Sequence, residues 1–395
     1  RVLFRSDTPG IETIELDVPP AQFDSGDNSD MQRLIGELRQ RNIPDPVAPV
    51  RLYPKTTEVL AQTTRASATL FRVSGIDRLT DIRPSGVNAP SFAVACDIGT
   101  TTVAARLIDC YTGAVIATAA RMNRQYSLAD DVASRITAAE ADGGLKELQR
   151  LVVAETLSPI IDELCGDASV DRTRIGAIVI AANSVMTHLL LGWPVRGFGR
   201  VPFNGVSLEP PVVDASSIGL TLADGAPLFA FPSLAAYIGG DITAGIAATG
   251  LLDRKETTLF VDLGTNCEIV LTHQDERTAC STPAGPAFEG EGIDCSSPAA
   301  PGAIERIRFN DDGIAFDVIG GFRPRGLCGS ALVDILGRGV QSGLLGPTGR
   351  LKRGASAVDG SDRSGRRARS IVIAPESLTA PDRKSTRLNS SHESP

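Results

Sequence analysis

Two segments of the chain repeat the same order of strands and turns, and this repeat constrains the fold more than any other feature. The first is FAVACDIGTTTVAARLIDCYTGAVIATAA at residues 92–120, and the second is TLFVDLGTNCEIVLTHQDERTACSTPA at residues 258–284. Each reads as an apolar strand, the motif D-x-G-T, a second strand, a polar turn and a third strand. Asp97 and Asp262 therefore hold matching positions. The repeat predicts a duplicated domain.

The D-x-G-T loop contains the residue types that hold phosphate and magnesium. A glycine two residues after the acid lets the backbone turn sharply and approach a ligand, and threonines add hydroxyl donors to the exposed amides. The acid repels phosphate, but it can hold Mg²⁺ through water, and the ion then bridges the phosphates. Asp97 and Asp262 are therefore the predicted magnesium ligands and catalytic residues. The predicted phosphate contacts are Gly99, Thr100, Thr101, Thr102, Gly264, Thr265 and Asn266.

Two such loops facing each other would grip one polyphosphate from both sides and stabilise its charge. The alternative is a plain turn in which Asp and Thr side chains satisfy only backbone groups. One copy fits both interpretations equally well, whereas two copies in the same strand context favour a ligand. Rival phosphate motifs are missing, because no G-x-x-x-x-G-K-[ST] stretch occurs and GFGRVP at 197–202 lacks the third glycine of a dinucleotide site.

Composition and charge narrow the class of protein. A chain of 395 residues with 42% hydrophobic and 22% charged side chains can bury a large core in two or three domains. Its formal net charge of −8 argues against nucleic acid or an anionic membrane as a partner. The seven cysteines occur singly, without a C-x-x-C pair, which is typical of reduced thiols in the cytoplasm. The longest uncharged stretch, 175–193, is interrupted by polar residues and predicts a buried strand and a short helix instead of a membrane span.

The order of predicted elements divides the chain into a small unit and two lobes. Residues 11–80 contain strands and a helix, so we predict a small α+β domain there, followed by a linker at 81–91. We place the first lobe, with the first loop, at 92–250 and the second lobe, with the second loop, at 251–380.

Helices and chain ends complete this division. Helical spacing at 128–140 and 145–164 follows the strands of the first repeat, which makes the fold α/β. Residues 1–10 and 383–395 contain RVLFRS and RKSTRLNSSHESP, which resemble translated sequencing-adapter read-through, and we leave them out of the fold. The chain does not begin with Met, so we expect a fragment with a truncated second lobe.

Further segments resemble one family within the actin-like (ASKHA) ATPase superfamily, whose domain is duplicated and ribonuclease H-like. They are ANSVMTHLLLG at 182–192, FPSLAAYIGGDITAGIAATGL at 231–251, DLGTNCEIVL at 262–271, ACSTPAGPAFEGEGIDCSSPAAPGAIERI at 279–307 and VIGGFRPRGLCGSALVDIL at 318–336. They look like the ATP-binding domain of the reductive activators of corrinoid proteins, and they come in that family's order. The unit at 11–80 looks like the family's middle domain.

The resemblance implies an ATP-driven redox role. In members of the family, an iron–sulfur cluster accepts an electron from an electron donor. ATP with Mg²⁺ then drives the transfer of this electron to a corrinoid protein, whose Co(II) is reduced to Co(I). The 2Fe-2S cluster would lie in a ferredoxin-like domain before residue 11, so the seven cysteines are not assigned to it. The family's L-A-G-G-F-G adenosine loop has no counterpart in the chain. We expect a chain without both parts to bind nucleotide weakly and to be inactive.

Two other functions fit the same loops. One is a small-molecule kinase of the superfamily, which needs a substrate acid in the cleft, and the other is a non-catalytic ATP-binding module like that of Hsp70. A C-x₄-C-x₂-C…C pattern upstream would favour the activator. The sequence leaves open which corrinoid protein is served and whether the chain forms a homodimer.

Individual polar residues outside the loops also carry expectations. Asp241 begins a predicted helix in GGDITAG, where an acid ordinarily caps the helix, but the resemblance to the connecting helix of the actin-like fold makes it a candidate catalytic residue that orients the attacking water. Asn183 is predicted to cap a helix and His188 to be buried and hydrogen-bonded. Glu268 fits a metal contact and a cross-strand partner equally well, and 284–295 is expected to be a surface loop near the cleft.

Overall fold

The computed structural model describes most of the chain. The described residues are 10–22, 29–73, 75–87, 91–264, 266–283, 295–297, 299–310, 313–352, 358–361, 367–375, 377–379 and 386–389. The chain divides into two compact units: residues 1–260 with 271–279, and residues 261–270 with 280–395. The predicted boundary between the lobes, at 250/251, stays a prediction, because residues 258–283 contribute to both compact units.

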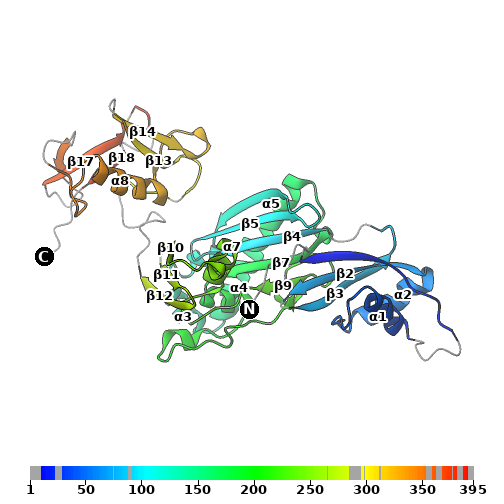
Figure 1. Cartoon of the computed structure of the whole chain (residues 1–395). Coiled ribbons are helices and arrows are strands. Elements are labelled where there is room, and N and C mark those ends of the chain that lie inside the picture. The colour runs from blue at the N-terminus through cyan, green and yellow to red at the C-terminus, as the bar shows by residue number, and fades with distance from the viewer. Residues whose placement is uncertain are drawn as a thin grey trace. The chain divides into compact units, whose positions relative to one another are not determined.

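The first unit is built on a six-stranded mixed sheet with the order β6-β5-β4-β7-β9-β8 (Figure 1). Its strands are β4 (Phe92–Ile98), β5 (Thr102–Asp109), β6 (Val115–Met122), β7 (Ile175–Ala182), β8 (Val213–Asp214) and β9 (Pro227–Ala230). β4, β5 and β6 form the antiparallel meander that the first repeat predicts. β7 is parallel to β4 and to β9, which requires long crossover connections on the way.

The crossovers are helical. The helices are α3 (Val132–Ala139), α4 (Gly144–Val152), α5 (Ser158–Ala168), α6 (Ser184–Leu191) and α7 (Gly240–Thr249). The helix predicted at 128–140 is thus shorter than expected, and the one predicted at 145–164 is divided by a π-helical turn at Val153–Leu157.

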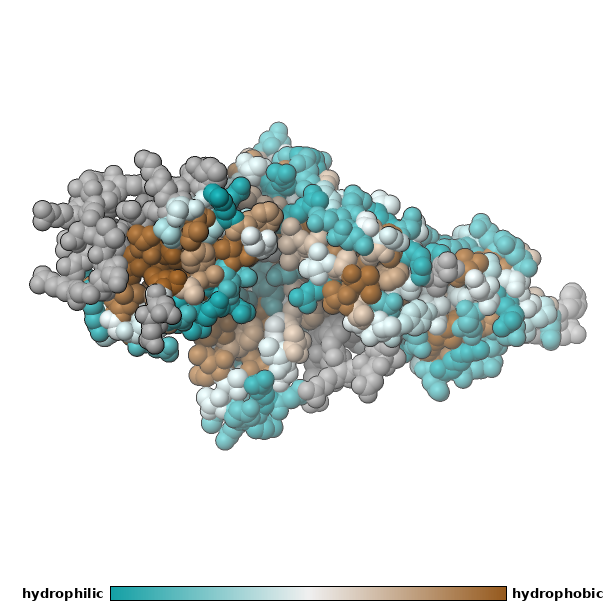
Figure 2. Space-filling view, turned by 90° about the horizontal axis from the view of Figure 1, so that it is seen from above, coloured by the Kyte–Doolittle hydropathy of each residue, from teal (hydrophilic) through white to brown (hydrophobic). Residues whose placement is uncertain are grey.

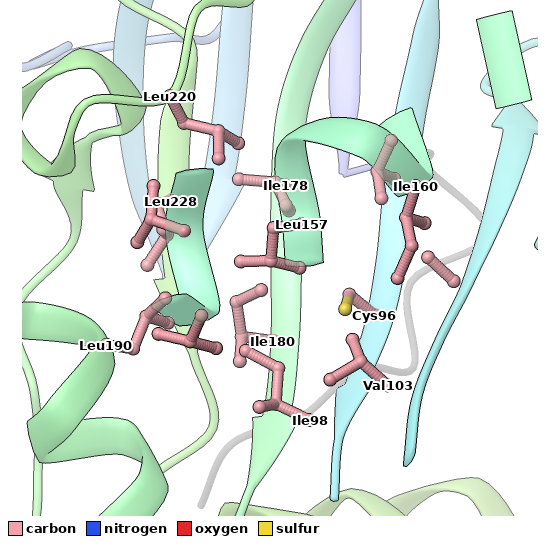
Figure 3. Packing of buried hydrophobic residues seen from close by; sticks show 14 of the residues in the cluster. Cys96, Ile98, Val103, Leu157, Ile160, Ile178, Ile180, Leu190, Leu220 and Leu228 are labelled. Carbon is pink, nitrogen blue, oxygen red and sulfur yellow. The ribbon is translucent and has the colours of Figure 1, made fainter. Parts of the chain in front are cut away.

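The main hydrophobic core lies between one face of the sheet and these helices. Every second strand residue points into it, and Cys96, Ile98 and Ile180 gather there with Leu157 and Ile160 of the helical layer (Figure 3). The four Leu and Ile side chains are completely buried, and burial of such a side chain contributes about 1.5–3 kcal/mol. The same packing fixes the strand ends from which the first D-x-G-T loop departs.

The opposite face of the sheet packs against the N-terminal part of the chain. Its elements are β1 (Ile11–Asp17), α1 (Asp30–Gln40), α2 (Leu52–Gln62), β2 (Arg65–Val73) and β3 (Ile76–Pro84), with the sheet order β1-β2-β3. Ile11, Phe71 and Val73 form a cluster with Ala177 and Phe229 of the six-stranded sheet. The small α+β arrangement at 11–80 is therefore present, but it belongs to the same compact unit as the first lobe.

The linker predicted at 81–91 is shorter than expected. Residues 81–84 complete β3, because Pro84 pairs with Ala66 of β2. Polar contacts also join the N-terminal part to the rest of the unit. Arg51 donates to the carbonyl oxygen of Gly225 at 3.2 Å and forms ion pairs with Asp214 and Asp224 at 3.7 and 3.5 Å.

The second repeat folds as the first one does. It forms a three-stranded sheet, β10-β11-β12, made of β10 (Thr258–Leu263), β11 (Asn266–His273) and β12 (Glu276–Pro283). The strand–turn–strand–turn–strand order predicted from the sequence is therefore confirmed in both copies.

The second unit continues with two further sheets. Its elements are β13 (Ala303–Asn310), β14 (Gly313–Val318), β15 (Gly326–Leu327), α8 (Gly329–Gln341), β16 (Val358–Ser361), β17 (Arg367–Ala374) and β18 (Thr386–Asn389). A second core joins α8 to β13 and β17 through Ile335, Ile304 and Ile371. Four residues of the tail that we excluded at 383–395 form β18, which pairs with β17.

The described residues contain no candidate membrane helix and no disulfide. No helix in the described ranges is long and apolar enough to cross a bilayer. Hydrophobic residues reach the surface in patches among hydrophilic ones (Figure 2). All seven cysteines are free, and most of them are buried: Cys96, Cys165, Cys267, Cys295 and Cys328.

Candidate functional site

The first D-x-G-T loop leaves the six-stranded sheet where two parallel strands end together. Asp97 is the next-to-last residue of β4 and lies opposite Ala181 of β7, which ends one residue later. Its side chain is exposed, in contrast to the buried Cys96 and Ile98 on either side. Ligands of open α/β sheets bind outside the carboxyl ends of parallel strands, so this edge is the natural place for a site.

Two glycines bring the start of α7 to the same edge. A Cβ added at Gly239 would lie 2.4 Å from the Cα of Asn183, and one at Gly240 would lie 2.5 Å from the carbonyl oxygen of Phe231. Only glycine permits so close an approach to the residues that follow β7 and β9. Asp241, the next residue, is thus carried to the edge of the sheet that holds Asp97.

Asp241 does not cap α7. The N-cap is Gly239, and Asp241 lies in the first turn, where its Oδ1 accepts a hydrogen bond from the amide of Ile242 at 2.8 Å. The side chain is half-buried. The ordinary capping role is therefore excluded, and the role of a carboxylate at the site stays a prediction.

The first loop turns its carbonyl groups toward the protein interior. The carbonyl oxygen of Gly99 accepts from Asn123 Nδ2 at 3.0 Å, that of Thr100 from Arg135 Nη2 at 2.6 Å, and that of Thr101 from the amide of Asn123 at 2.7 Å. In a trans peptide, C=O and the following N–H point in opposite directions. The amides of Thr100 and Thr101 therefore point away from the interior, and neither has a backbone acceptor in the described ranges.

The side chains of the loop add further donors. Thr100, Thr101 and Thr102 make no side-chain hydrogen bond to any described residue, and all three are at least partly exposed. Gly99 closes the turn by donating its amide to the carbonyl oxygen of Thr102 at 3.0 Å. Outward amides beside uncommitted hydroxyls make an anion-binding concavity, so the loop fits a phosphate group.

A buried polar network supports the loop, and no motif in the sequence indicates it. Asn123, Gln125 and Arg135 have no exposed surface. Gln125 donates its amide to Asn123 Oδ1 at 3.1 Å, and its Oε1 accepts from Arg135 Nη1 at 3.2 Å. Burial lowers the pKa of Arg135 to about 10, although the charges of Asp131 and Asp130 oppose this, so the guanidinium remains protonated at neutral pH. Sequence reasoning missed the network because an arginine on an amphipathic helix ordinarily faces water.

The second loop is one residue shorter than the first, since its glycine donates to the residue two positions on and not three, and its acid has a different environment. The amide of Gly264 donates to the carbonyl oxygen of Asn266 at 3.1 Å, and Thr265 lies outside the described residues. Burial raises the pKa of Asp262. Burial also raises the pKa of Glu268, and the charge of Asp262 raises it further. Two half-buried carboxyl groups that repel each other are a set that a cation would stabilise.

Glu268, Asn183 and His188 each have a hydrogen-bond partner within the protein. Ser281 Oγ donates to Glu268 Oε1 at 3.0 Å, so Glu268 does have the cross-strand partner that the sequence allowed. Asn183 caps α6 by accepting from the amide of Met186 at 2.9 Å, as predicted. His188 is buried and hydrogen-bonded, as predicted: Nδ1 contacts the carbonyl oxygen of Ser184 at 2.7 Å, and Nε2 accepts from the amide of Val206 at 3.0 Å. Of the loop expected at 284–295, residues 284–294 lie outside the described ranges.

Two family models match the chain side by side. The model described as the RACo middle region matches residues 92–254, and the model described as the C-terminal domain of RACo, the ASKHA domain, matches residues 256–385. The label of middle region thus belongs to 92–254, and the unit at 11–80, to which we had given it, lies outside that match. A solved structure, the reductive activator for corrinoid, iron–sulfur protein, matches with a TM-score of 0.84 and 31% identity over 96% of this chain and 60% of that chain. The chain belongs to this family of reductive activators of corrinoid proteins, whose C-terminal domain is of the actin-like ATPase type.

Particular relatives are found in two organisms. The corrinoid activation enzyme RamQ of Eubacterium limosum is 33% identical over 78% of this chain and 53% of its own length. The [Co(II) methylated amine-specific corrinoid protein] reductase of Methanosarcina barkeri is 24% identical over 67% of this chain and 53% of its own length. The chain therefore spans about half the length of the curated relatives that it matches.

Proposed function

We propose that the chain is the ATP-binding part of a reductive activator of a corrinoid protein. The observation that carries the proposal is the first loop, in which three consecutive carbonyl groups are held inward and the amides of Thr100 and Thr101 point outward. The hydroxyls of the three threonines add donors for phosphate oxygens. A polyphosphate is the ligand that uses all of these donors together.

Both loops would contact the polyphosphate and its magnesium ion. Thr100, Thr101 and Thr102, with the backbone of Gly99, would bind phosphate oxygens at the first loop. Gly264, Thr265 and Asn266 would do so at the second loop. Asp97 and Asp262 would hold Mg²⁺ through water, because carboxylates at strand ends are its ordinary ligands. The magnesium ion would neutralise phosphate charge while the nucleotide is bound.

Asp241 would orient the water that attacks the terminal phosphate. A carboxylate in this role accepts a proton of the water and aligns its lone pair, so it must lie beyond the phosphate and not against it. The start of α7 supplies a rigid support for such a group, since Gly239 and Gly240 fix it against the strand ends. Placement on a helix keeps the carboxylate oriented between turnovers.

In the whole protein, ATP hydrolysis would drive an unfavourable electron transfer. One electron from a reduced 2Fe-2S cluster, held in a ferredoxin-like domain and refilled by an electron donor, converts Co(II) of the corrinoid protein to Co(I). The relatives named for corrinoid activation and for Co(II) reduction support this reaction. Binding at the two loops would act by favouring one arrangement of the protein, which requires different nucleotide affinities in the two arrangements. We place the protein in the cytoplasm.

Absorption spectroscopy of the corrinoid tests the proposal. The full protein, an electron donor and a Co(II) corrinoid protein are mixed with ATP, with ADP or without nucleotide. We expect the Co(I) spectrum only with ATP. A protein that binds ATP and phosphorylates a small molecule, while the corrinoid stays Co(II), would establish the kinase alternative.

A further inference from the structure

Arg135 is a buried cation that makes no ion pair with any carboxylate of the described residues. Its side chain has no exposed surface. Its guanidinium donates to the carbonyl oxygens of Ala129 at 3.1 Å and Thr100 at 2.6 Å, and it also contacts Gln125 Oε1 at 3.2 Å and Met186 Sδ at 3.1 Å. All four acceptors are neutral. Among the described residues, no carboxylate lies within 4.0 Å of the guanidinium.

Such a placement is unfavourable by itself. Neutral acceptors satisfy the hydrogen-bonding groups of a guanidinium, but they do not replace the water that stabilises its charge. Asp131, the nearest acid in sequence, caps α3 by accepting from the amide of Ser134 at 2.6 Å, and its charge and that of Asp130 only partly offset the effect of burial on the pKa of Arg135. An anion that arrives close to Arg135 would therefore be stabilised by a charge that is already desolvated.

The peptide between Thr100 and Thr101 connects Arg135 to the outer side of the loop. Its C=O accepts from Arg135, and its N–H points in the opposite direction, away from the interior. The dipole of this peptide is thus aligned with the guanidinium, which polarises the N–H as a donor. A ligand phosphate bound at this N–H would be stabilised by the peptide dipole and by the positive charge of Arg135.

We propose that Arg135 is a positioning residue that fixes the loop of residues 99–102 and whose buried charge finds its counter-charge in the bound polyphosphate. This inference rests on the proposed nucleotide binding and deepens it, because it assigns the charge that balances the phosphates on the side of the first loop. Arg135 does not touch the ligand and acts through the peptide of Thr100.

The test compares the affinity of full-length variants for inorganic triphosphate and inorganic phosphate by calorimetry. Arg135→Met removes the charge and retains an apolar side chain of similar length, and we expect triphosphate affinity to fall by about tenfold or more, equivalent to roughly 1.4 kcal/mol. The loss should be larger for triphosphate than for phosphate, since the effect grows with the charge of the ligand. Arg135→Lys keeps a charge and should lie between wild type and Arg135→Met. The matched control is Arg150→Met, on the exposed part of α4, where Arg150 pairs with Glu147.

A second variant keeps the inference testable if Arg135→Met does not fold. Gln125→Glu places a carboxylate at the atom that lies 3.2 Å from Arg135 Nη1, so the protein supplies its own counter-charge. We expect the variant to fold and to bind triphosphate at least several-fold more weakly than wild type, an effect that a purely structural role for Arg135 does not produce.

The outcomes separate the inference from the proposed function. Equal triphosphate affinity in wild type, Arg135→Met and Gln125→Glu overturns the role of Arg135 and leaves nucleotide binding intact. If the affinities for phosphate and triphosphate fall by the same factor, the charge of Arg135 does not contribute to binding. Arg135 then only holds the loop in place. A wild-type protein that binds neither triphosphate nor ATP overturns the proposed function, and the role of Arg135 with it.

Discussion

Gly99→Ala is the substitution whose effect follows most directly from the geometry of the first loop. A Cβ at this position would lie 2.6 Å from the carbonyl oxygen of Thr102, whereas ordinary contact begins at 3.4 Å. The oxygen is part of the backbone, so no side-chain rotation relieves the contact. Residue 99 and Thr102 must separate by about 0.8 Å, which breaks their hydrogen bond of 3.0 Å.

The cost can be worked out from the bonds that meet at residue 99. Loss of the bond to Thr102 costs about 1 kcal/mol, and displacement of the Gly99 carbonyl leaves the buried Asn123 Nδ2 without its acceptor, which costs about 1–3 kcal/mol more. We therefore expect Gly99→Ala to lower the free energy of unfolding by about 2–4 kcal/mol. Because the amides of Thr100 and Thr101 move with the turn, ATP affinity should fall as well.

Urea unfolding and ATP titration check this expectation, with Gly36→Ala as the matched control. A Cβ at Gly36, inside α1, meets no atom within 4 Å, so alanine there should raise the free energy of unfolding by about 0.5–1 kcal/mol through its higher helix propensity. Replacement of glycine by alanine should thus change the free energy of unfolding in opposite directions at the two sites. A Gly99→Ala protein with wild-type stability and wild-type ATP affinity would refute the reasoning.

Three further predictions concern other parts of the chain. In the full protein, Asp97→Ala and Asp262→Ala should each abolish ATP hydrolysis while the far-ultraviolet circular dichroism spectrum is unchanged. Burial lowers the pKa of His188, so the unfolded chain binds its proton more readily, and the free energy of unfolding should fall as the pH drops below about 6.5. His188→Gln should flatten this part of the pH profile. Arg51→Ala removes the link to Gly225 and should lower the free energy of unfolding by about 1–2 kcal/mol and speed proteolysis between α2 and β3.

Each of these predictions has a result that contradicts it. Unchanged turnover in either aspartate variant would remove that acid from the site. A pH profile that is the same with and without His188 would mean that its burial does not control the acid sensitivity. For Arg51, the exposed ion pair of Lys255 and Asp275 provides a control, since Lys255→Ala should leave the free energy of unfolding within about 0.5 kcal/mol of wild type.

The sequence predicted those helices and strands whose formation depends on neighbouring residues. The uncharged stretch at 175–193 predicted a buried strand and a short helix, which are β7 and α6. Asn183 marked the start of α6, because the amide that its side chain caps lies within the next turn of backbone. The linker predicted at 81–91 began too early, since residues 81–84 belong to β3 and the pairing of Pro84 with Ala66 depends on a strand that precedes it in sequence. Residues 386–389 form β18 only by pairing with β17, which no local pattern predicts, and the assignment of 383–395 to adapter read-through stays a prediction.

The sequence by itself determined the two strand–turn–strand repeats and the glycine in each turn, because these features depend on the backbone freedom and side-chain alternation of neighbouring residues. Only the tertiary structure decided what lies beneath the first turn. Asn123 and Arg135 reach the loop from 24 and 35 positions away. A buried arginine is tolerated only where neutral acceptors converge on it in space, and no local pattern specifies such a convergence.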